Sequence, residues 1–269
     1  MEVIIRPTED DAARLAARLI ERQLRLKPTS VLGLATGRTM EHIYAELVAL
    51  HCDAGLDFSL CRTFNLDEYV GLPPDDPHSY RYYMNEQLFD HVNIDPRNTH
   101  LPNGVAEDLG AESAGYEELI RESGGIDLQL LGIGESGHIG FNEPLSALQS
   151  RTREKALTRT TVAQNAPLFG GADKMPKRGI TMGVGTILEC RACLLVATGA
   201  AKAAVMARAV EGPITSMISA SALQLHPKCR IIVDEAAASE LRGQEYYRWI
   251  FENEPEWQEF KENAEMPKR

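Results

Sequence analysis

The sequence lacks any apolar run close to the roughly 18 residues that a membrane-spanning helix needs. Its N-terminus reaches Glu2 at once and has no apolar core of a secretion signal. Hydrophobic residues make up 43% and charged residues 25% of the 269 positions, as in ordinary globular proteins. We therefore expect a soluble cytoplasmic protein with one large α/β domain or two small ones.

Positive charge is also scarce. The chain has 28 Lys and Arg against 39 Asp and Glu, which gives a formal net charge of −11. This balance argues against nucleic acid as the main partner. An anionic ligand would need a local pocket of positive charge, because the overall field repels it.

Cysteine clusters and cofactor motifs are missing as well. The five cysteines are scattered, and Cys190-x-x-Cys193 has no second Cys or His pair at metal-binding spacing. Apolar neighbours such as Leu194 favour core packing for this pair, and we expect all five to be reduced thiols. No dinucleotide fingerprint and no Walker-type ending is present. The sequence therefore predicts no metal and no cofactor.

What the sequence does have is a regular alternation of strand and helix patterns. Strands are predicted at 2–6, 31–35, 61–65, 126–133, 180–184, 192–198 and 230–234. Helices are predicted at 8–26, from about 40, from 79, at 109–122, after Gly199 with Lys202 in the first turn, and after 243. This order predicts a single-domain, three-layer, Rossmann-like α/β fold over 1–269 with a mostly parallel sheet. The polar tail after about 254 is expected to be partly disordered, unless Trp257 and Phe260 dock.

Two predicted strand ends have the features of a phosphate site. The strand at 31–35 runs into Thr36-Gly37-Arg38-Thr39 and a helix, so free N–H groups and the positive helix end would face the loop. The strand at 192–198 runs into Gly199 and a helix start with Lys202. A cation is unfavourable there unless a bound anion compensates it. A plain helix cap is the alternative for the first loop.

Two further strand ends carry acid–base groups. Phe64-Asn-Leu-Asp-Glu-Tyr-Val-Gly-Leu72 ends an apolar run with adjacent carboxylates, which could face a ligand at the sheet rim or cap the next helix. The stretch Gly134–Pro144 holds three glycines that let the backbone approach a ligand, and also Ser136, His138 and Glu143. A lone His is often structural, but a His in such a loop with a carboxylate nearby favours a functional role.

Residues 145–178 form the most polar part of the chain and are rich in Lys and Arg. This stretch is interpreted either as a lid that brings cationic charge over an anionic ligand, or as a solvated surface excursion. Together with the strand ends, it predicts acid–base chemistry on a small phosphorylated metabolite such as a sugar phosphate.

Three motifs also resemble a known family. They are Phe64–Leu72, Gly132-Ile-Gly134 with Gly137-His-Ile-Gly-Phe-Asn-Glu-Pro144, and Leu223-Gln-Leu-His-Pro-Lys228, and they look like the glucosamine-6-phosphate deaminase (isomerase) family. The resemblance implies conversion of glucosamine 6-phosphate and water into fructose 6-phosphate and ammonia. It implies that Asp67 is the base that moves a proton from C2 to C1, and that His138 with Glu143 assists ring opening. The loop 36–39 and Lys202 match the family's phosphate contacts.

The sequence departs from the family pattern at three positions. Ser136, grouped here with the catalytic residues, stands where the family usually has Asp or Asn, and Ser can only hydrogen-bond to the imidazole. Met40 replaces a common Pro after the phosphate loop. Pro167 lies where some members carry a lid arginine, and we hypothesise that Arg38 replaces some of that charge.

Regulation and substrate choice have alternatives. Arg153 and Lys155 match basic residues of the effector site of allosteric, hexameric members, which leaves allostery and a homo-oligomer open. A deaminase for a related amino sugar such as galactosamine 6-phosphate is the main rival. A non-catalytic sugar-phosphate sensor is less favoured, because Asp67, His138 and Glu143 occur together. The related phosphogluconolactonases lack the motif at 64–72.

Overall fold

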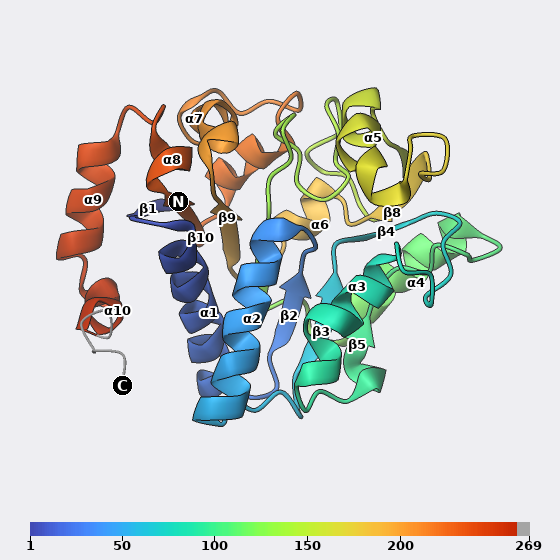
Figure 1. Cartoon of the computed structure of the whole chain (residues 1–269), viewed down its shortest axis with the longest axis horizontal. Coiled ribbons are helices and arrows are strands. Elements are labelled where there is room, and N and C mark those ends of the chain that lie inside the picture. Colours follow the sequence, from blue (N-terminus) through green and yellow to red (C-terminus); the bar gives the residue numbers. More distant parts are fainter. Residues whose placement is uncertain (263–269) are drawn as a thin grey trace.

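The computed structural model describes residues 1–262. Its centre is a seven-stranded sheet in the order β1-β10-β9-β6-β2-β3-β5, with every neighbouring pair parallel (Figure 1). The strands are β1 (Glu2–Arg6), β2 (Val31–Leu34), β3 (Arg62–Asn65), β5 (Thr99–His100), β6 (Leu128–Leu131), β9 (Cys193–Ala197) and β10 (Cys229–Asp234). The strands β2, β6 and β9 are buried throughout and, apart from Gln129 of β6, apolar, as in a parallel sheet covered on both faces.

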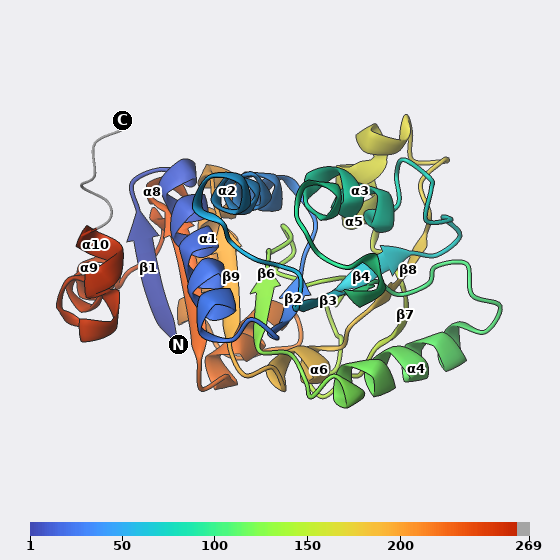
Figure 2. The ribbon, with the colours of Figure 1, turned by 90° about the horizontal axis from the view of Figure 1, so that it is seen from below.

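Helices cover both faces of this sheet. They are α1 (Glu9–Leu26), α2 (Arg38–Ala54), α3 (Tyr80–Gln87), α4 (Leu109–Glu122), α5 (Arg159–Asn165), α6 (Val184–Leu188), α7 (Ala203–Glu211), α8 (Glu235–Ala238), α9 (Gln244–Asn253) and α10 (Gln258–Glu262). Figure 2 shows α2 and α3 on one side of the sheet and α4 and α6 on the other. This arrangement confirms the predicted three-layer α/β fold.

Short 3-10 turns complete the connections. They are η1 (Phe89–His91), η2 (Pro96–Asn98), η3 (Ala166–Phe169), η4 (Ala200–Lys202), η5 (Ser219–Leu225) and η6 (Pro255–Trp257). Several helix starts follow the predicted caps: Thr8 accepts from Asp11 N, and Ser79 accepts from Tyr82 N. The helix expected from about Met40 begins two residues earlier, at Arg38.

A second sheet has three antiparallel strands, in the order β4 (Asp67–Tyr69), β8 (Arg178–Thr181) and β7 (Arg153–Ala156). The strand expected at 180–184 is therefore wrong in two respects. It ends at Thr181, and it pairs outside the parallel sheet. From Val184 the chain is helical. The strands β4, β5 and β7 were not expected from the sequence.

The predicted lid, residues 145–178, contains β7, α5 and η3 and packs on a small apolar cluster of its own. Tyr69, Phe141, Phe169 and Met175 are buried together, and the Tyr69 ring contacts those of Phe141 and Phe169 at centroid distances of 5.3 and 5.4 Å. The alternative that residues 145–178 are a solvated surface segment therefore does not hold for Phe169 and Met175, whose side chains are buried.

The C-terminal segment is ordered at least to Glu262. Trp257 is 1% exposed and joins the main core, and Phe260 packs against that core, so these two side chains dock, which was the alternative to disorder. Disorder was also expected for residues 263–269, which lie outside the described residues.

All five cysteines are free, and Cys190 and Cys193 are core residues, as predicted. Within 1–262, no helix is long and apolar enough to cross a membrane.

Candidate functional site

Four neighbouring strands deliver the predicted site residues to one edge of the sheet. The loop 36–39 follows β2, Asp67 lies just after β3, the Gly134–Pro144 loop follows β6, and Lys202 follows β9. These strands are adjacent in the order β9-β6-β2-β3. The strands that follow β2 in the chain are added toward one edge of the sheet, and those that follow β6 toward the other edge. Open α/β sheets bind ligands at such a topological switch point.

Asp67 is a buried carboxyl at this edge. It lies on β4 opposite Thr181 and is 6% exposed. Burial raises its pKa to about 8, and the neighbouring Glu68 charge adds to the effect. A Cβ on Gly140 would lie 3.3 Å from Asp67 Oδ2, and Gly140 has φ +55°. The loop that carries His138 therefore packs directly on Asp67.

Glu68 has a different role from its neighbour. Its carboxylate accepts backbone hydrogen bonds from Tyr80 and Arg81, both at 2.9 Å, and from Tyr69 at 2.8 Å. Tyr80 and Arg81 are the first residues of α3, so Glu68 satisfies free N–H groups at that helix start. The capping alternative is thus right for Glu68, whereas Asp67 faces the site.

His138, Ser136 and Glu143 form a connected group. The His138 Nδ1 lies 2.6 Å from Ser136 Oγ and 3.3 Å from Glu143 Oε2, and Ser136 Oγ lies 3.4 Å from the same oxygen. Burial would raise the pKa of Glu143, but hydrogen bonds from His138 and Thr161 lower it to about 2. An ionised Glu143 can only accept, so Nδ1 carries the proton and Nε2 is left for a ligand.

Glycines fix how His138 sits. A Cβ on Gly134 would lie 2.2 Å from the His138 ring atoms Cε1 and Nε2, so only glycine lets the imidazole lie over this turn. Gly137 has φ +83°, a conformation that favours glycine. Ser219 of η5 holds the same loop: its hydroxyl accepts from Ile139 N at 3.2 Å and donates to Asn142 O at 2.7 Å.

The predicted phosphate residues also come together. Gly37 has φ +119° and precedes α2 without a side-chain cap, so the helix start is open to a ligand. Lys202 donates from Nζ to Ile133 O at 2.8 Å, and burial, together with the positive charge of Arg38, lowers its pKa. Thr39 and Thr198, from the loops after β2 and β9, have hydroxyls 3.3 Å apart. A bound anion would relieve the repulsion between the two cations.

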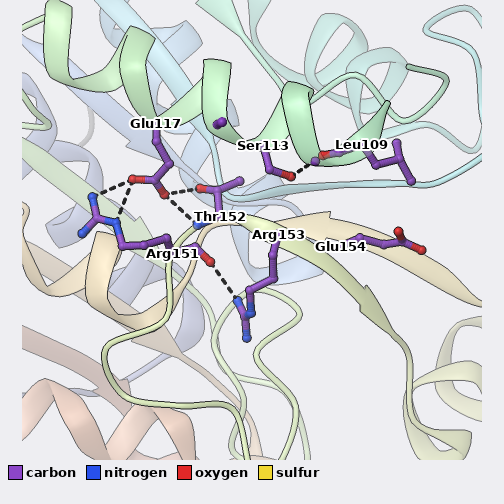
Figure 3. Close-up of a pocket in the computed structure, with 9 residues that line it drawn as sticks. Leu109, Ser113, Glu117, Arg151, Thr152, Arg153 and Glu154 are labelled. Atoms are coloured by element: carbon purple, nitrogen blue, oxygen red, sulfur yellow. Dashed lines mark hydrogen bonds and ion pairs between the residues drawn. The ribbon is translucent and has the colours of Figure 1, made fainter. Parts of the chain in front are cut away.

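Several lid cations are neutralised away from this edge. Arg151 pairs with Glu117 and Glu189, both at 2.6 Å, and Arg178 pairs with Glu154 at 2.5 Å. A shallow groove of about 360 Å³ lies between α4 and β7, and Figure 3 shows Glu117 and Arg151 facing each other there. Neither Asp67 nor His138 lines it. Cationic cover of a ligand by the lid stays a prediction.

The two predicted effector residues lie on β7. Arg153 donates from Nη1 to Asn142 Oδ1 at 2.8 Å, which links β7 to the residue before Glu143. Lys155 is half-buried opposite Gly179 of β8. An effector role for them stays a prediction. Sequence reasoning missed Thr158 and Thr161, whose side chains contact Glu143. The spacing Thr158-x-x-Thr161 was a readable helix-cap signal, since Thr158 accepts from Thr161 N.

The structure is that of an α/β protein with a candidate acid–base centre at the switch point of a parallel sheet. The family model described as glucosamine-6-phosphate isomerases/6-phosphogluconolactonase matches residues 7–231, and the chain belongs to this family. The resemblance seen in its motifs is thereby confirmed.

Relatives in this family are similar over nearly the whole chain. A glucosamine-6-phosphate deaminase of Hahella chejuensis is 50% identical over 93% of this chain and 95% of its own length. One from an Arthrobacter species is 50% identical over 96% and 99%. The solved structure of a monomeric glucosamine-6-phosphate deaminase matches with a TM-score of 0.88 at 43% identity, over 89% of this chain and all of that one. A 6-phosphogluconolactonase from Trypanosoma brucei, at 19% identity and TM-score 0.69, shares the fold.

Proposed function

We propose that this protein is a glucosamine-6-phosphate deaminase, which converts glucosamine 6-phosphate and water into fructose 6-phosphate and ammonia. Relatives with this activity in their names align with almost the full chain at about half identity. The observation that carries the proposal is the position of Gly140, in the His138 loop, where a Cβ would lie 3.3 Å from Oδ2 of the buried Asp67. This proximity supports a base and a second proton-transfer group acting at one ligand position.

The phosphate binds at the open start of α2 and at Lys202. Backbone N–H groups of the loop 36–39, the Arg38 guanidinium and the Lys202 ammonium supply the positive field that a chain of net charge −11 otherwise lacks. Binding of the phosphate group fixes the sugar relative to Asp67 and His138. Much of the loss of entropy needed for the later proton transfers therefore occurs already on binding.

His138 opens the pyranose ring. Its Nε2 accepts the proton of the C1 hydroxyl, and a proton is returned to the ring oxygen as the C1–O5 bond breaks. The products are a C1 aldehyde and a C5 hydroxyl, with no net proton gained or lost. Ser136 and Glu143 hold Nδ1 as a donor, which keeps Nε2 in its accepting form.

Asp67 then moves a proton from C2 to C1 through an enolamine. In the empty site its carboxyl, with a pKa of about 8, holds a proton at neutral pH. The cationic ammonium group of the substrate favours the carboxylate, so binding releases that proton and creates the base. As C2 loses its proton, the C1 carbonyl oxygen takes one from the substrate ammonium group, and reprotonation at C1 by Asp67 then leaves a protonated imine at C2. Water adds to that carbon, ammonia leaves, and the ketone of fructose 6-phosphate forms.

The test is ammonia release from a panel of amino-sugar phosphates. Glucosamine 6-phosphate should be turned over, and the Asp67→Asn variant should be inactive. No turnover of glucosamine 6-phosphate, with turnover of galactosamine 6-phosphate, would move the assignment to the related amino sugar. Full activity of Asp67→Asn would remove the proposed base. Self-association and effector control stay predictions, to be measured by sedimentation and by rate curves with the acetylated substrate.

A further inference from the structure

Glu143 is shared between the catalytic loop and the lid. Its Oε2 faces His138 and Ser136. Its Oε1 accepts from the Thr158 backbone N–H at 3.2 Å, from the Thr158 hydroxyl at 3.1 Å and from the Thr161 hydroxyl. Glu143 is 3% exposed, so these donors take the place of water as hydrogen-bond partners of Oε1. One carboxylate thus touches the lid with one oxygen and the catalytic imidazole with the other.

The lid contacts the catalytic loop at other points as well, for example through Ser146 N, which donates to Glu143 O at 3.0 Å. Arg153 of β7 reaches Asn142, one residue before Glu143. Phe169 and Met175 of the lid also share an apolar cluster with Phe141 of the catalytic loop. Thr158 and Thr161 are the first capped turn of α5, so any movement of this helix away from the loop breaks all three contacts to Oε1.

We propose that Thr158 and Thr161 are positioning residues, and that through Glu143 they couple the seating of the lid helix α5 to the setting of His138. The proposal rests on the proposed function for its catalytic part, because it assigns His138 to ring opening. Its structural part, the anchoring of α5 by Glu143, does not depend on any substrate.

The physical reason lies in how donors share a carboxylate. Three donors on Oε1 fix the plane of the Glu143 group and draw negative charge away from Oε2. Without these donors the carboxylate rotates more freely, so the orientation of the His138 ring over Gly134 is less well fixed. The charge on Oε2 also increases, which changes how strongly Oε2 attracts the Nδ1 proton. Both effects should make proton transfer at Nε2 less effective. Because Thr161 itself touches no reacting atom, substrate binding should change little.

Thr161→Val and Thr161→Ser form a matched pair for the catalytic part. Valine keeps the shape and removes the hydroxyl, whereas serine keeps the hydroxyl. We expect kcat to fall about tenfold in Thr161→Val, as for one lost hydrogen bond to a charged group, with KM little changed. Thr161→Ser should recover most of kcat. Equal kcat in Thr161→Val and the unaltered protein, or equal impairment of both variants, would overturn the proposal.

A reduced, acyclic amino-alditol 6-phosphate separates ring opening from general damage. This compound has no ring to open, so its affinity reports the integrity of the site. Thr161→Val should bind it as tightly as the unaltered protein does, by calorimetry. A parallel loss of affinity and kcat would show a merely structural role and would overturn the catalytic part.

Hydrogen exchange tests the anchoring without turnover. In Glu143→Ala, the amides of residues 158–165 should exchange at least about tenfold faster, because Oε1 no longer holds the start of α5. Glu154→Ala is the matched control, since Glu154 is a lid carboxylate paired with the exposed Arg178. Equal exchange in both variants would refute the anchoring. A failure of the proposed function would instead appear as absence of deamination in the unaltered protein.

Discussion

The exchange of Asp67 for Asn should abolish activity and at the same time stabilise the protein at alkaline pH. The carboxyl is 6% exposed, and its pKa in the folded protein is about 8, against an ordinary value of 3.8. Asn has almost the same shape and never ionises. The variant therefore removes the proposed base and, with it, the cost of charging a buried group.

The sign and size of the stability effect follow from proton binding. Between the ordinary pKa and the raised one, the folded protein holds a proton that the unfolded chain has lost. The free energy of unfolding therefore falls as pH rises, by about 1.4 kcal/mol per pH unit for this group. From about pH 5 to about pH 7.5 this amounts to roughly 3 kcal/mol. The loss stops above the folded pKa of about 8, and Asp67→Asn lacks it altogether.

Denaturant unfolding at several pH values measures this effect. The free energy of unfolding of Asp67→Asn, minus that of the unaltered protein, should grow by about 3 kcal/mol across that range, while kcat falls by at least about a hundredfold. Asp75→Asn, at an exposed loop position, is the control and should leave both quantities unchanged. If the two stability curves ran parallel with pH, the buried carboxyl would already be ionised in the free protein, and the reasoning would fail.

Three further substitutions test other parts of the molecule. Arg38→Ala should raise KM for the phosphosugar about tenfold with kcat largely unchanged, since it removes a charged phosphate contact; an unchanged KM would exclude Arg38 from the phosphate site. Gly134→Ala places a Cβ 2.2 Å from His138 ring atoms and should cost about a hundredfold in kcat/KM, with the far-ultraviolet circular dichroism unaltered. Trp257→Ala should lower the free energy of unfolding by about 3 kcal/mol in urea and leave kcat intact; a loss of kcat would mean that the C-terminal segment shapes the site.

The parallel sheet could be predicted because its strands are continuous apolar runs between helices with clear ends. The helix expected at 109–122 occurs as Leu109–Glu122, and the strand expected at 31–35 occurs as Val31–Leu34. The small sheet could not be predicted. Its strands have three or four residues, and Asp67 pairs with Thr181, more than a hundred positions away. Strand patterns this short carry no signal of register or partner.

The site was predictable where local sequence forces local geometry. Glycines around His138 and at position 37 indicate tight backbone turns near polar groups. In the structure these loops lie at one edge of the sheet. Thr158 and Thr161 could not be found in this way. Their contact with Glu143 depends on the lid folding back across the loop after β6, which is a tertiary event. The Thr158-x-x-Thr161 spacing could have indicated the helix start, which was not predicted, but not the carboxylate that it faces.

The motif that contains Asp67 and Glu68 shows why a capping role and a catalytic role need not exclude each other. Successive residues of a strand point to opposite sides, so two adjacent carboxylates on β4 cannot share an environment. Burial raises the pKa of Glu68, and its three backbone N–H donors oppose that rise. Asp67 has only burial and the Glu68 charge, and both raise its pKa. The pair is thus divided into an anchor for α3 and a buried carboxyl, and the anchor contributes to the raised pKa of its neighbour.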